Sequence, residues 1–257
     1  MGDYLYRYIS FEAFVGMIQK ESLTFMLPAL WDDPKEGIPF EQLLENFDKE
    51  KVYERIMLFS VYQKTYAQCW TKLSESDAMW RIYSFNNRAI QIRVSKKNLQ
   101  LLPDIHLVPV KYVNRFEPGD SIGIDAFLQS LATKRRAFEH EKEVRLIKYY
   151  RFSGNEDLEQ HINAFLASFD HPKRMEIVDS IFPELSLEEK VDKIVKLLNI
   201  GNKKQKTLEV SYQHIPNFIA GVKVHPLAPD WYIDVVKEYC TRNKIPFDGR
   251  STLYSNE

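Results

Sequence analysis

The order of strand-like and helix-like segments most limits the fold of this chain. Segments in which apolar and polar residues alternate, as is typical of strands, follow one another without a helix between each pair. They lie at 4–9, 22–28, 67–72, 88–94, 106–113, 138–147, 206–213, 218–226 and 251–254. A doubly wound parallel sheet needs a helix between successive strands, so this order favours an α+β fold with a split, largely antiparallel sheet and flanking helices.

The expected helices are unevenly placed along the chain. Ser10 is a helix cap before a short apolar-faced segment, and Ser74 with Asp77 resembles the start of a capping box. Further helices are expected at 40–66, 74–83, 125–138 and 228–243.

The character of the chain changes between residues 155 and 200. Three amphipathic helical patterns follow one another there, and the last begins at Ser186 and ends at Gly201. We therefore expect a single domain over 1–257, with a core made of 1–154 and 201–257 and a helical insertion at 155–200.

Charge and composition argue against several classes of protein. The net charge is −1, which lacks the basic excess typical of nucleic-acid-binding proteins. No histidine pair has zinc-ligand spacing, no glycine-rich nucleotide loop occurs, and no apolar run is long enough to span a membrane. Cys69 and Cys240 are far apart and are expected to be free thiols. Because the N-terminus also lacks a signal-peptide pattern, we expect a cytoplasmic protein without membrane contacts.

The stretch FEHEKEVRLI, residues 138–147, carries the strongest indication of chemistry. In a strand, Glu141, Glu143 and Arg145 share one face, and Val144 and Leu146 share the other. Two carboxyl groups so close together raise the pKa of at least one, which suits a general acid or base. A solvated strand face with an internal ion pair has the same pattern.

Aromatic residues near an arginine form a second candidate group. Tyr6 and Tyr8 share one face of the first expected strand, with Arg7 opposite, and Trp80 and Tyr83 share a helix face. Aromatic faces beside a cation suit a flat ligand such as a nucleotide base or nicotinamide. Core packing predicts the same residues.

Two charged segments allow further interpretations. Lys134 begins a basic run that suits phosphate binding or the C-terminus of a helix. Asp32, Asp33 and Glu36 lie in a turn-rich loop at 31–37, where carboxylates suit a divalent cation, although Asp-Pro is first of all a turn former.

Together these motifs resemble a widespread bacterial family, the domain of unknown function 2971. The resemblance covers the chain outside 155–200. It rests on Leu5-Tyr6-Arg7-Tyr8, on Asp32-Asp33-Pro34-Lys35-Glu36, on Met79, Trp80 and Tyr83, and on Lys134, Phe138, Glu141, Glu143 and Arg145. Many relatives have glycine after the aromatic helix, where this chain has SFNNRA.

The order of these motifs also resembles, more distantly, the ADP-ribosyltransferase fold. That resemblance implies a pocket for NAD as co-substrate and no metal. It implies Glu143 as the catalytic carboxylate, with Glu141 assisting the acceptor and Arg145 orienting both. The NAD-binding residues would be Tyr6, Arg7, Tyr8, Trp80, Tyr83 and Lys134.

Three functions follow from these observations. The first is an NAD-dependent ADP-ribosyltransferase or NAD-cleaving enzyme, such as an effector of phage defence or of a toxin system, with a protein or nucleic acid as acceptor. The second is a metal-dependent nuclease or phosphodiesterase that uses Asp33, Glu36, Glu141 and Glu143 with Lys134. The third is a non-enzymatic ligand-binding or regulatory module. Divalent-metal dependence and NAD binding separate the three.

Overall fold

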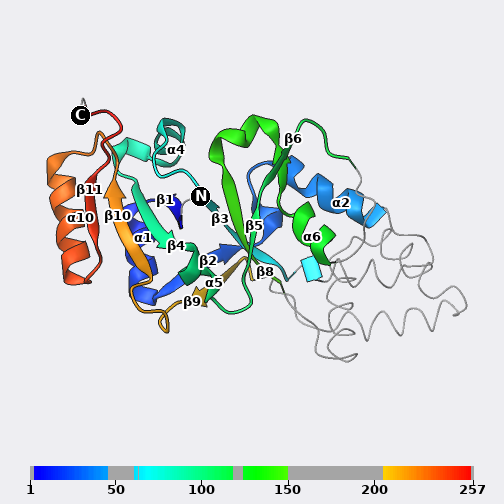
Figure 1. The fold of residues 1–257 in the computed structure, drawn as a ribbon, viewed down its shortest axis with the longest axis horizontal. Helices are drawn as coiled ribbons and strands as arrows, with labels where there is room; N and C mark the ends of the chain where they lie inside the picture. The colour runs from blue at the N-terminus through cyan, green and yellow to red at the C-terminus, as the bar shows by residue number, and fades with distance from the viewer. Residues whose placement is uncertain (1–2, 46–60, 63, 118–123, 150–204, 256–257) are drawn as a thin grey trace, which may run out of the picture.

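The computed structural model describes residues 3–45, 61–62, 64–117, 124–149 and 205–255 (Figure 1). The strands are β1 (Tyr4–Ile9), β2 (Ser22–Met26), β3 (Tyr66–Thr71), β4 (Ile90–Ser95), β5 (His106–Pro109), β6 (Lys111–Val113), β7 (Thr133–Arg135), β8 (Glu143–Lys148), β9 (Thr207–Ser211), β10 (Ile219–Val224) and β11 (Phe247–Arg250). The α-helices are α1 (Phe11–Lys20), α2 (Ile38–Glu45), α4 (Asp77–Tyr83), α5 (Lys96–Gln100), α6 (Ile124–Ser130) and α10 (Asp230–Arg242). Short 3-10 helices are η1 (Pro28–Leu30), η2 (Pro34–Gly37), η4 (Phe85–Asn87) and η5 (Arg136–Glu141).

Nine of the strands form one mixed, mostly antiparallel sheet. Its order is β11-β10-β4-β1-β3-β2-β9, and β8 joins it by pairing with β3 on one side and with β5 on the other. Within this sheet only β10 and β11 are parallel; β6 and β7 form a separate parallel pair. Helices flank the sheet, so the predicted α+β class is confirmed.

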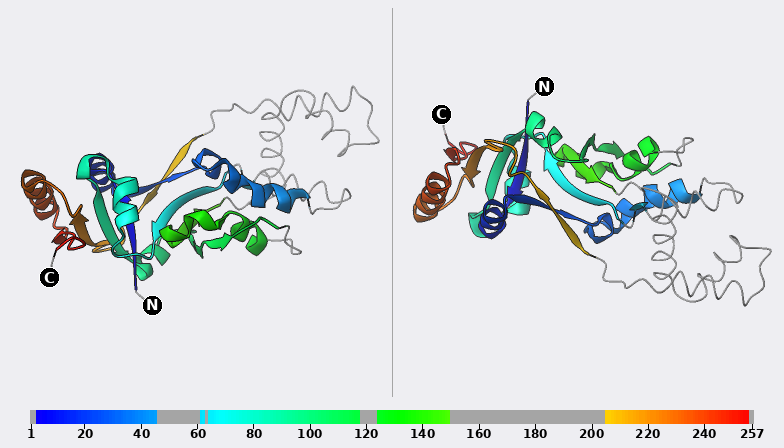
Figure 2. Two further views of the ribbon diagram at one scale, coloured as in Figure 1. Left: turned by 90° about the horizontal axis from the view of Figure 1, so that it is seen from above. Right: turned by 90° about the horizontal axis from the view of Figure 1, so that it is seen from below.

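The sheet is split between β1 and β3. These two strands pair through one residue pair, Tyr6 with Thr71, whereas β1 runs beside β4 from Tyr4 to Ile9 and β3 runs beside β8 along its whole length. Figure 2 shows the consequence: β1, β4, β10 and β11 group with α10 at one end, and β3, β5 and β8 group with α2 and α6 at the other. The predicted split is therefore present.

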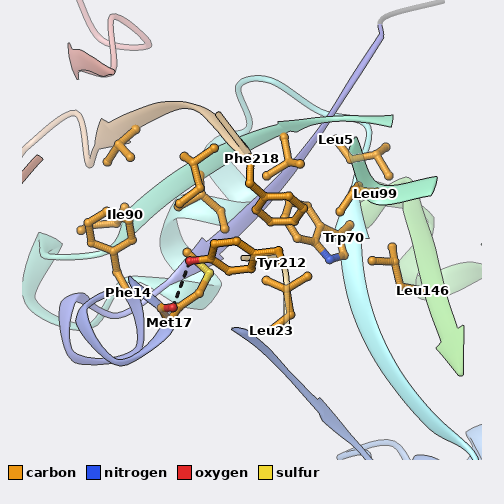
Figure 3. Close-up of a cluster of buried hydrophobic side chains, with 14 of the residues drawn as sticks. Leu5, Phe14, Met17, Leu23, Trp70, Ile90, Leu99, Leu146, Tyr212 and Phe218 are labelled. Carbon is orange, nitrogen blue, oxygen red and sulfur yellow. Dashed lines mark hydrogen bonds between the residues drawn. The ribbon is translucent and has the colours of Figure 1, made fainter. Parts of the chain in front are cut away.

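The main core fills the space between α1, α10 and the sheet. Leu5, Ile90 and Trp70 are almost completely buried, and the rings of Tyr212 and Phe218 stack with centroids 4.3 Å apart (Figure 3). Val144 and Leu146 belong to this core, as the alternation in β8 predicts. Burying each large apolar side chain contributes about 1.5–3 kcal/mol, so this cluster holds the two groups of strands together.

Helix α1 begins and ends where the sequence indicates. The Ser10 hydroxyl accepts a hydrogen bond from the Ala13 N–H at 3.2 Å, as an N-cap should. Phe14 and Met17 face the core, and Glu21 ends the helix in a left-handed conformation with φ 47°. Helix α1 therefore connects β1 to β2 and packs beside the split in the sheet.

The predicted helix at 125–138 is wrong beyond Ser130. Helix α6 stops there, and Thr133 begins β7, which pairs in parallel with β6. The Thr133 hydroxyl donates to the carbonyl of Gln129 at 2.7 Å, which satisfies one of the helix's last carbonyls. Lys134 thereby lies on a strand rather than on a helix.

The predicted strand at 138–147 is also wrong in its first part. Residues Arg136–Glu141 form η5, Lys142 has a left-handed φ of 44°, and the strand begins only at Glu143. The Lys142 N–H donates to the Glu139 carbonyl at 3.2 Å, the i→i+3 bond of a tight turn. Glu143 and Arg145 share a strand face as expected, but Glu141 reaches that face from η5.

Smaller boundaries differ as well. The expected strand at 106–113 divides after Pro109, which has no N–H for the ladder. The cap of α4 is Ser76, not Ser74. Residues 251–254 form no strand, because β11 ends at Arg250 and a turn follows.

Two predictions fall largely on residues that the structure leaves undescribed. The helix expected over 40–66 is seen as α2 up to Glu45 and again at 61–62, and 46–60 and 63 lie outside the described residues. Its predicted end is wrong, because β3 begins at Tyr66. The whole 155–200 insertion lies outside them too. Among the helices of the described ranges, none is both long and apolar enough to cross a membrane.

Candidate functional site

A pocket of about 220 Å³ lies where the sheet splits. The strands on either side of the single β1–β3 contact supply two walls, and α4, β7, η5 and the start of β8 supply the rest. The lining residues are Tyr6, Arg7, Tyr8, Cys69, Trp70, Thr71, Met79, Tyr83, Lys134, Glu141 and Glu143. Segments that are far apart in the sequence thus converge on one concavity, which is typical of a ligand site.

The structure brings seven of the nine predicted site residues to this pocket, and two lie behind its walls. Trp80 is completely buried; its ring meets Tyr8 edge to face at 4.7 Å, and its Nε1 donates to Glu75 at 3.3 Å. Arg145 is buried beneath Glu143. Both residues therefore support lining residues and do not face the cavity.

Arg145 holds the carboxylate of Glu143. Its Nε lies 2.8 Å from Glu143 Oε1, its Nη1 donates to the Leu131 carbonyl at 2.6 Å, and its Nη2 pairs with Glu36. The ring of Trp31 covers the guanidinium at 3.9 Å. A buried guanidinium with this many partners is fixed in position, and so is the carboxylate that it holds.

Lys134 connects three glutamates. Its ammonium lies 2.7 Å from Glu141, 3.2 Å from Glu143 and 3.3 Å from Glu36. It therefore supplies positive charge at the centre of three carboxylates. In the described ranges, no group of three or more His, Cys, Asp or Glu side chains is arranged to hold a metal ion.

The two pocket glutamates differ in proton affinity. Burial by itself raises the pKa of Glu143, but Arg145 and then Lys134 outweigh it and lower that pKa to about 2. Burial also raises the pKa of Glu141, and there it prevails over the opposing effect of Lys134, helped by the charge of Glu143. The pocket thus combines a fixed carboxylate with a carboxyl group that holds its proton more readily.

Arg7 contributes a different kind of charge. It is half-buried on β1 and lines the pocket, and among the described residues its guanidinium has no carboxylate or other hydrogen-bond partner. Burial lowers its pKa, while the nearby Cys69 and Tyr83 partly offset that effect. A half-buried cation that lines a pocket without a counter-charge favours an anionic ligand.

Several contributors to the site were missed from the sequence. Thr71 lines the pocket and donates to the Glu141 carbonyl at 2.6 Å, and the Tyr112 hydroxyl accepts from the Glu143 N–H at 2.8 Å. Cys69 lies opposite Arg145 in the β3–β8 ladder. Residues two apart on a strand share a face, as Cys69 and Thr71 do, but only the strand register shows that this face meets the glutamates.

The four carboxylates of the metal-dependent alternative do not all meet. Glu36, Glu141 and Glu143 surround Lys134, whereas Asp33 pairs with Arg135 at 3.0 Å and does not line the pocket. The Asp33 side chain also accepts from the Lys35 N–H at 3.1 Å, as expected of a residue that starts a turn.

Comparison of the chain with family models, with curated proteins and with solved structures found no match. Both resemblances drawn from the motifs therefore stay predictions.

Proposed function

We propose that this chain cleaves the bond between nicotinamide and ribose in NAD and transfers ADP-ribose to an acceptor or to water. The observation that carries the proposal is one pocket, at the split of a sheet, that combines the fixed carboxylate of Glu143 with the Arg7 guanidinium, which has no partner among the described residues. A dinucleotide presents the matching charges, because its pyrophosphate is anionic and its ribose becomes cationic as nicotinamide leaves.

Each wall has a role in this proposal. Arg7 binds the pyrophosphate, and Tyr6 and Tyr83 offer aromatic surface to the nicotinamide ring. Glu143 faces the ribose and stabilises the positive charge that develops there. A cavity of about 220 Å³ is below the roughly 300–1,000 Å³ usual for ligand sites, so it takes the nicotinamide–ribose end with the phosphate next to it, and the rest of the dinucleotide lies outside.

The transfer step balances with the residues present. The ribose–nicotinamide bond breaks, and its electron pair leaves with neutral nicotinamide. The acceptor hydroxyl, or water, forms the new bond to ribose and loses its proton. Glu141, in its ionised form, takes that proton, and its raised pKa makes it a stronger base than an ordinary glutamate.

Lys134 bears on the metal-dependent alternative. Its ammonium takes the position among Glu36, Glu141 and Glu143 at which a metal-dependent enzyme would need its cation. The NAD proposal needs no metal, so it predicts activity that is insensitive to chelator.

The two free thiols, Cys69 and Cys240, support a reducing compartment such as the cytoplasm.

The test is nicotinamide release from NAD by the purified chain, with and without EDTA. Glu143→Gln keeps the shape of the side chain and removes its charge, and should lower the rate on the order of a hundredfold to a thousandfold, about 2.7–4 kcal/mol. Glu139→Gln is the matched control, because Glu139 is a partly exposed glutamate on η5 that pairs only with Arg136 and Lys142 among the described residues.

Two results would end the proposal. One is activity that is unchanged in Glu143→Gln, and the other is activity that disappears with EDTA. NAD binding without any nicotinamide release would instead support the non-enzymatic alternative. A bound ligand at a hundred times its Kd should stabilise the fold by about 2.7 kcal/mol, so thermal shift detects it independently of turnover.

A further inference from the structure

The turn at 31–37 has no role in the proposed reaction, yet three of its residues contact cations that line the pocket or lie next to it. The Trp31 ring covers Arg145, Asp33 pairs with Arg135, and Glu36 pairs with both Arg145 and Lys134. None of the described side chains of the turn lines the pocket. The contacts through which the turn acts on the pocket are therefore those with the cations.

Glu36 is the residue of this turn with the strongest electrostatic connection. It is 6% exposed, one carboxylate oxygen meets the Arg145 guanidinium, and the other lies 3.3 Å from the Lys134 ammonium. The same two cations hold Glu143, and Lys134 also holds Glu141. Two cations are thus divided among three buried carboxylates.

Hydrogen bonds of the Asp33 carboxylate hold the turn that carries Glu36. Asp33 Oδ1 accepts from the Lys35 N–H at 3.1 Å and starts η2, while Asp33 Oδ2 accepts from the Nε and Nη2 of Arg135 at 3.1 and 3.0 Å. Arg135 is the neighbour of Lys134 on β7. The turn is therefore anchored beside the lysine that Glu36 contacts.

We infer that Glu36 is a positioning residue, which takes part of the charge of Lys134 and Arg145 and so limits how strongly these two cations hold the pocket glutamates. This inference rests on the proposed function for its catalytic meaning, but the charge division itself is a property of the free protein. Among the described residues, the groups that interact with Glu141 are Lys134 on β7, Glu143 on β8, Tyr83 on α4 and Tyr112 on β6. Arg7 on β1 and Cys69 on β3 line the same pocket without an ion pair or hydrogen bond to Glu141. Lys134 is the cation in contact with Glu141, so the division of its charge between Glu36 and Glu141 sets how strongly Glu141 is held.

The first experiment titrates the glutamate carboxyl carbons by NMR in the protein without NAD, with Glu141→Gln and Glu143→Gln used to assign the signals. Glu36→Gln should strengthen the hold of Lys134 on Glu141, and should lower the pKa of Glu141 by about one unit while that of Glu143 stays low. Glu139→Gln, on the same 3-10 helix as Glu141 but partly exposed, should leave both unchanged.

A purely structural role for Glu36 predicts something different. If the variant loosened the cluster, Arg145 would release Glu143 and the pKa of Glu143 would rise toward its ordinary value. That rise, or no movement of Glu141, would overturn the inference. If Glu36→Gln does not fold, Glu36→Asp takes its place and should move Glu141 in the same direction by less. Failure of both variants to fold would show a structural role and would also overturn it.

The second experiment measures the pH profile of nicotinamide release. In Glu36→Gln the acidic limb should shift to lower pH by the same amount as the Glu141 signal. The KM for NAD should stay within about twofold, because Glu36 does not line the pocket. A raised KM with an unshifted profile would contradict the inference. A wild-type chain that releases no nicotinamide would defeat the proposed function, and the NMR titration would still decide the role of Glu36.

Discussion

The two walls of the pocket carry charge in opposite ways. On the wall formed by β7, η5 and β8, each charged side chain is paired: Lys134 with three glutamates, and Glu143 with Lys134 and Arg145. On the β1 wall, Arg7 has no such partner among the described residues. The walls meet at the one residue pair that joins β1 to β3.

The paired wall is preorganised before a ligand arrives, whereas the wall with Arg7 is free to bind one. A buried, fully paired cluster offsets its desolvation within the protein, so its geometry is fixed before any ligand arrives. A half-buried cation without a protein partner is free to pair with an anionic group of a ligand. The β8 wall is therefore suited to act on a substrate, and the β1 wall is suited to hold its anionic part.

The largest effect is expected from Arg145→Met. The change keeps most of the volume but leaves Glu36 and Glu143 buried without their guanidinium, and should lower the free energy of unfolding by about 3–5 kcal/mol. Urea denaturation measures it, and Arg242→Met on the exposed side of α10 is the control. A loss no larger than that of the control would show that the cluster is not a connected unit.

The next effect concerns acid stability. The pKa of Glu143 is lowered to about 2 in the folded protein from 4.5, so Glu143 contributes stability above pH 4.5 that disappears as the pH falls toward 2. Between pH 5 and pH 2 the wild type should lose about 3 kcal/mol more of its unfolding free energy than Glu143→Gln does. Urea midpoints at several pH values test this. Parallel pH curves for the two proteins would mean that Arg145 and Lys134 do not hold an ionised Glu143.

Arg7→Met tests the other wall, where stability and binding should move in opposite directions. Because Arg7 has no partner in the part of the chain that the structure describes, removing its charge should leave the free protein as stable or more stable. Binding of ADP-ribose should weaken by about 1.5–3 kcal/mol, the value of a hydrogen bond to a charged group. Thermal unfolding and calorimetry measure the two quantities, and Arg93→Met, on β4 away from the pocket lining, is the control for binding. Loss of stability without loss of affinity would give Arg7 a structural role.

The regular parts of this architecture could be predicted from local patterns. Period-two alternation located β1, β4 and β10, and a single serine located the start of α1. These signals are local, since they depend on which side of a strand or helix faces the core. The antiparallel character of the sheet also followed from the spacing of the strands.

The candidate site could be predicted only in part, because its assembly depends on charges that are distant in the sequence. Glu141 and Glu143 reach the same pocket, but η5 and the left-handed Lys142 bring Glu141 there instead of a continuous strand. Lys134 lies on β7, where its ammonium meets three carboxylates, although the local pattern indicated a helix. No periodicity reveals that Glu36, about a hundred residues earlier, completes the cluster; the sequence grouped it with these residues only in the metal-dependent alternative, as a cation ligand and not as a partner of Lys134 and Arg145.

The smallest effect is expected from a pair that has partners but lies at the surface. Lys20 and Glu209 are 3.2 Å apart, with side chains 62% and 39% exposed, and Glu209 also accepts from Ser22 at 2.7 Å. Lys20→Gln should change the unfolding free energy by less than about 0.5 kcal/mol, because solvent screens exposed charges and the serine bond remains. The comparison with Arg145→Met then isolates burial, since both changes remove a cation from a carboxylate. If Lys20→Gln lowered the unfolding free energy as much as Arg145→Met, burial would not be what distinguishes the β8 wall. The proposal that this wall is preorganised would then rest on its geometry alone.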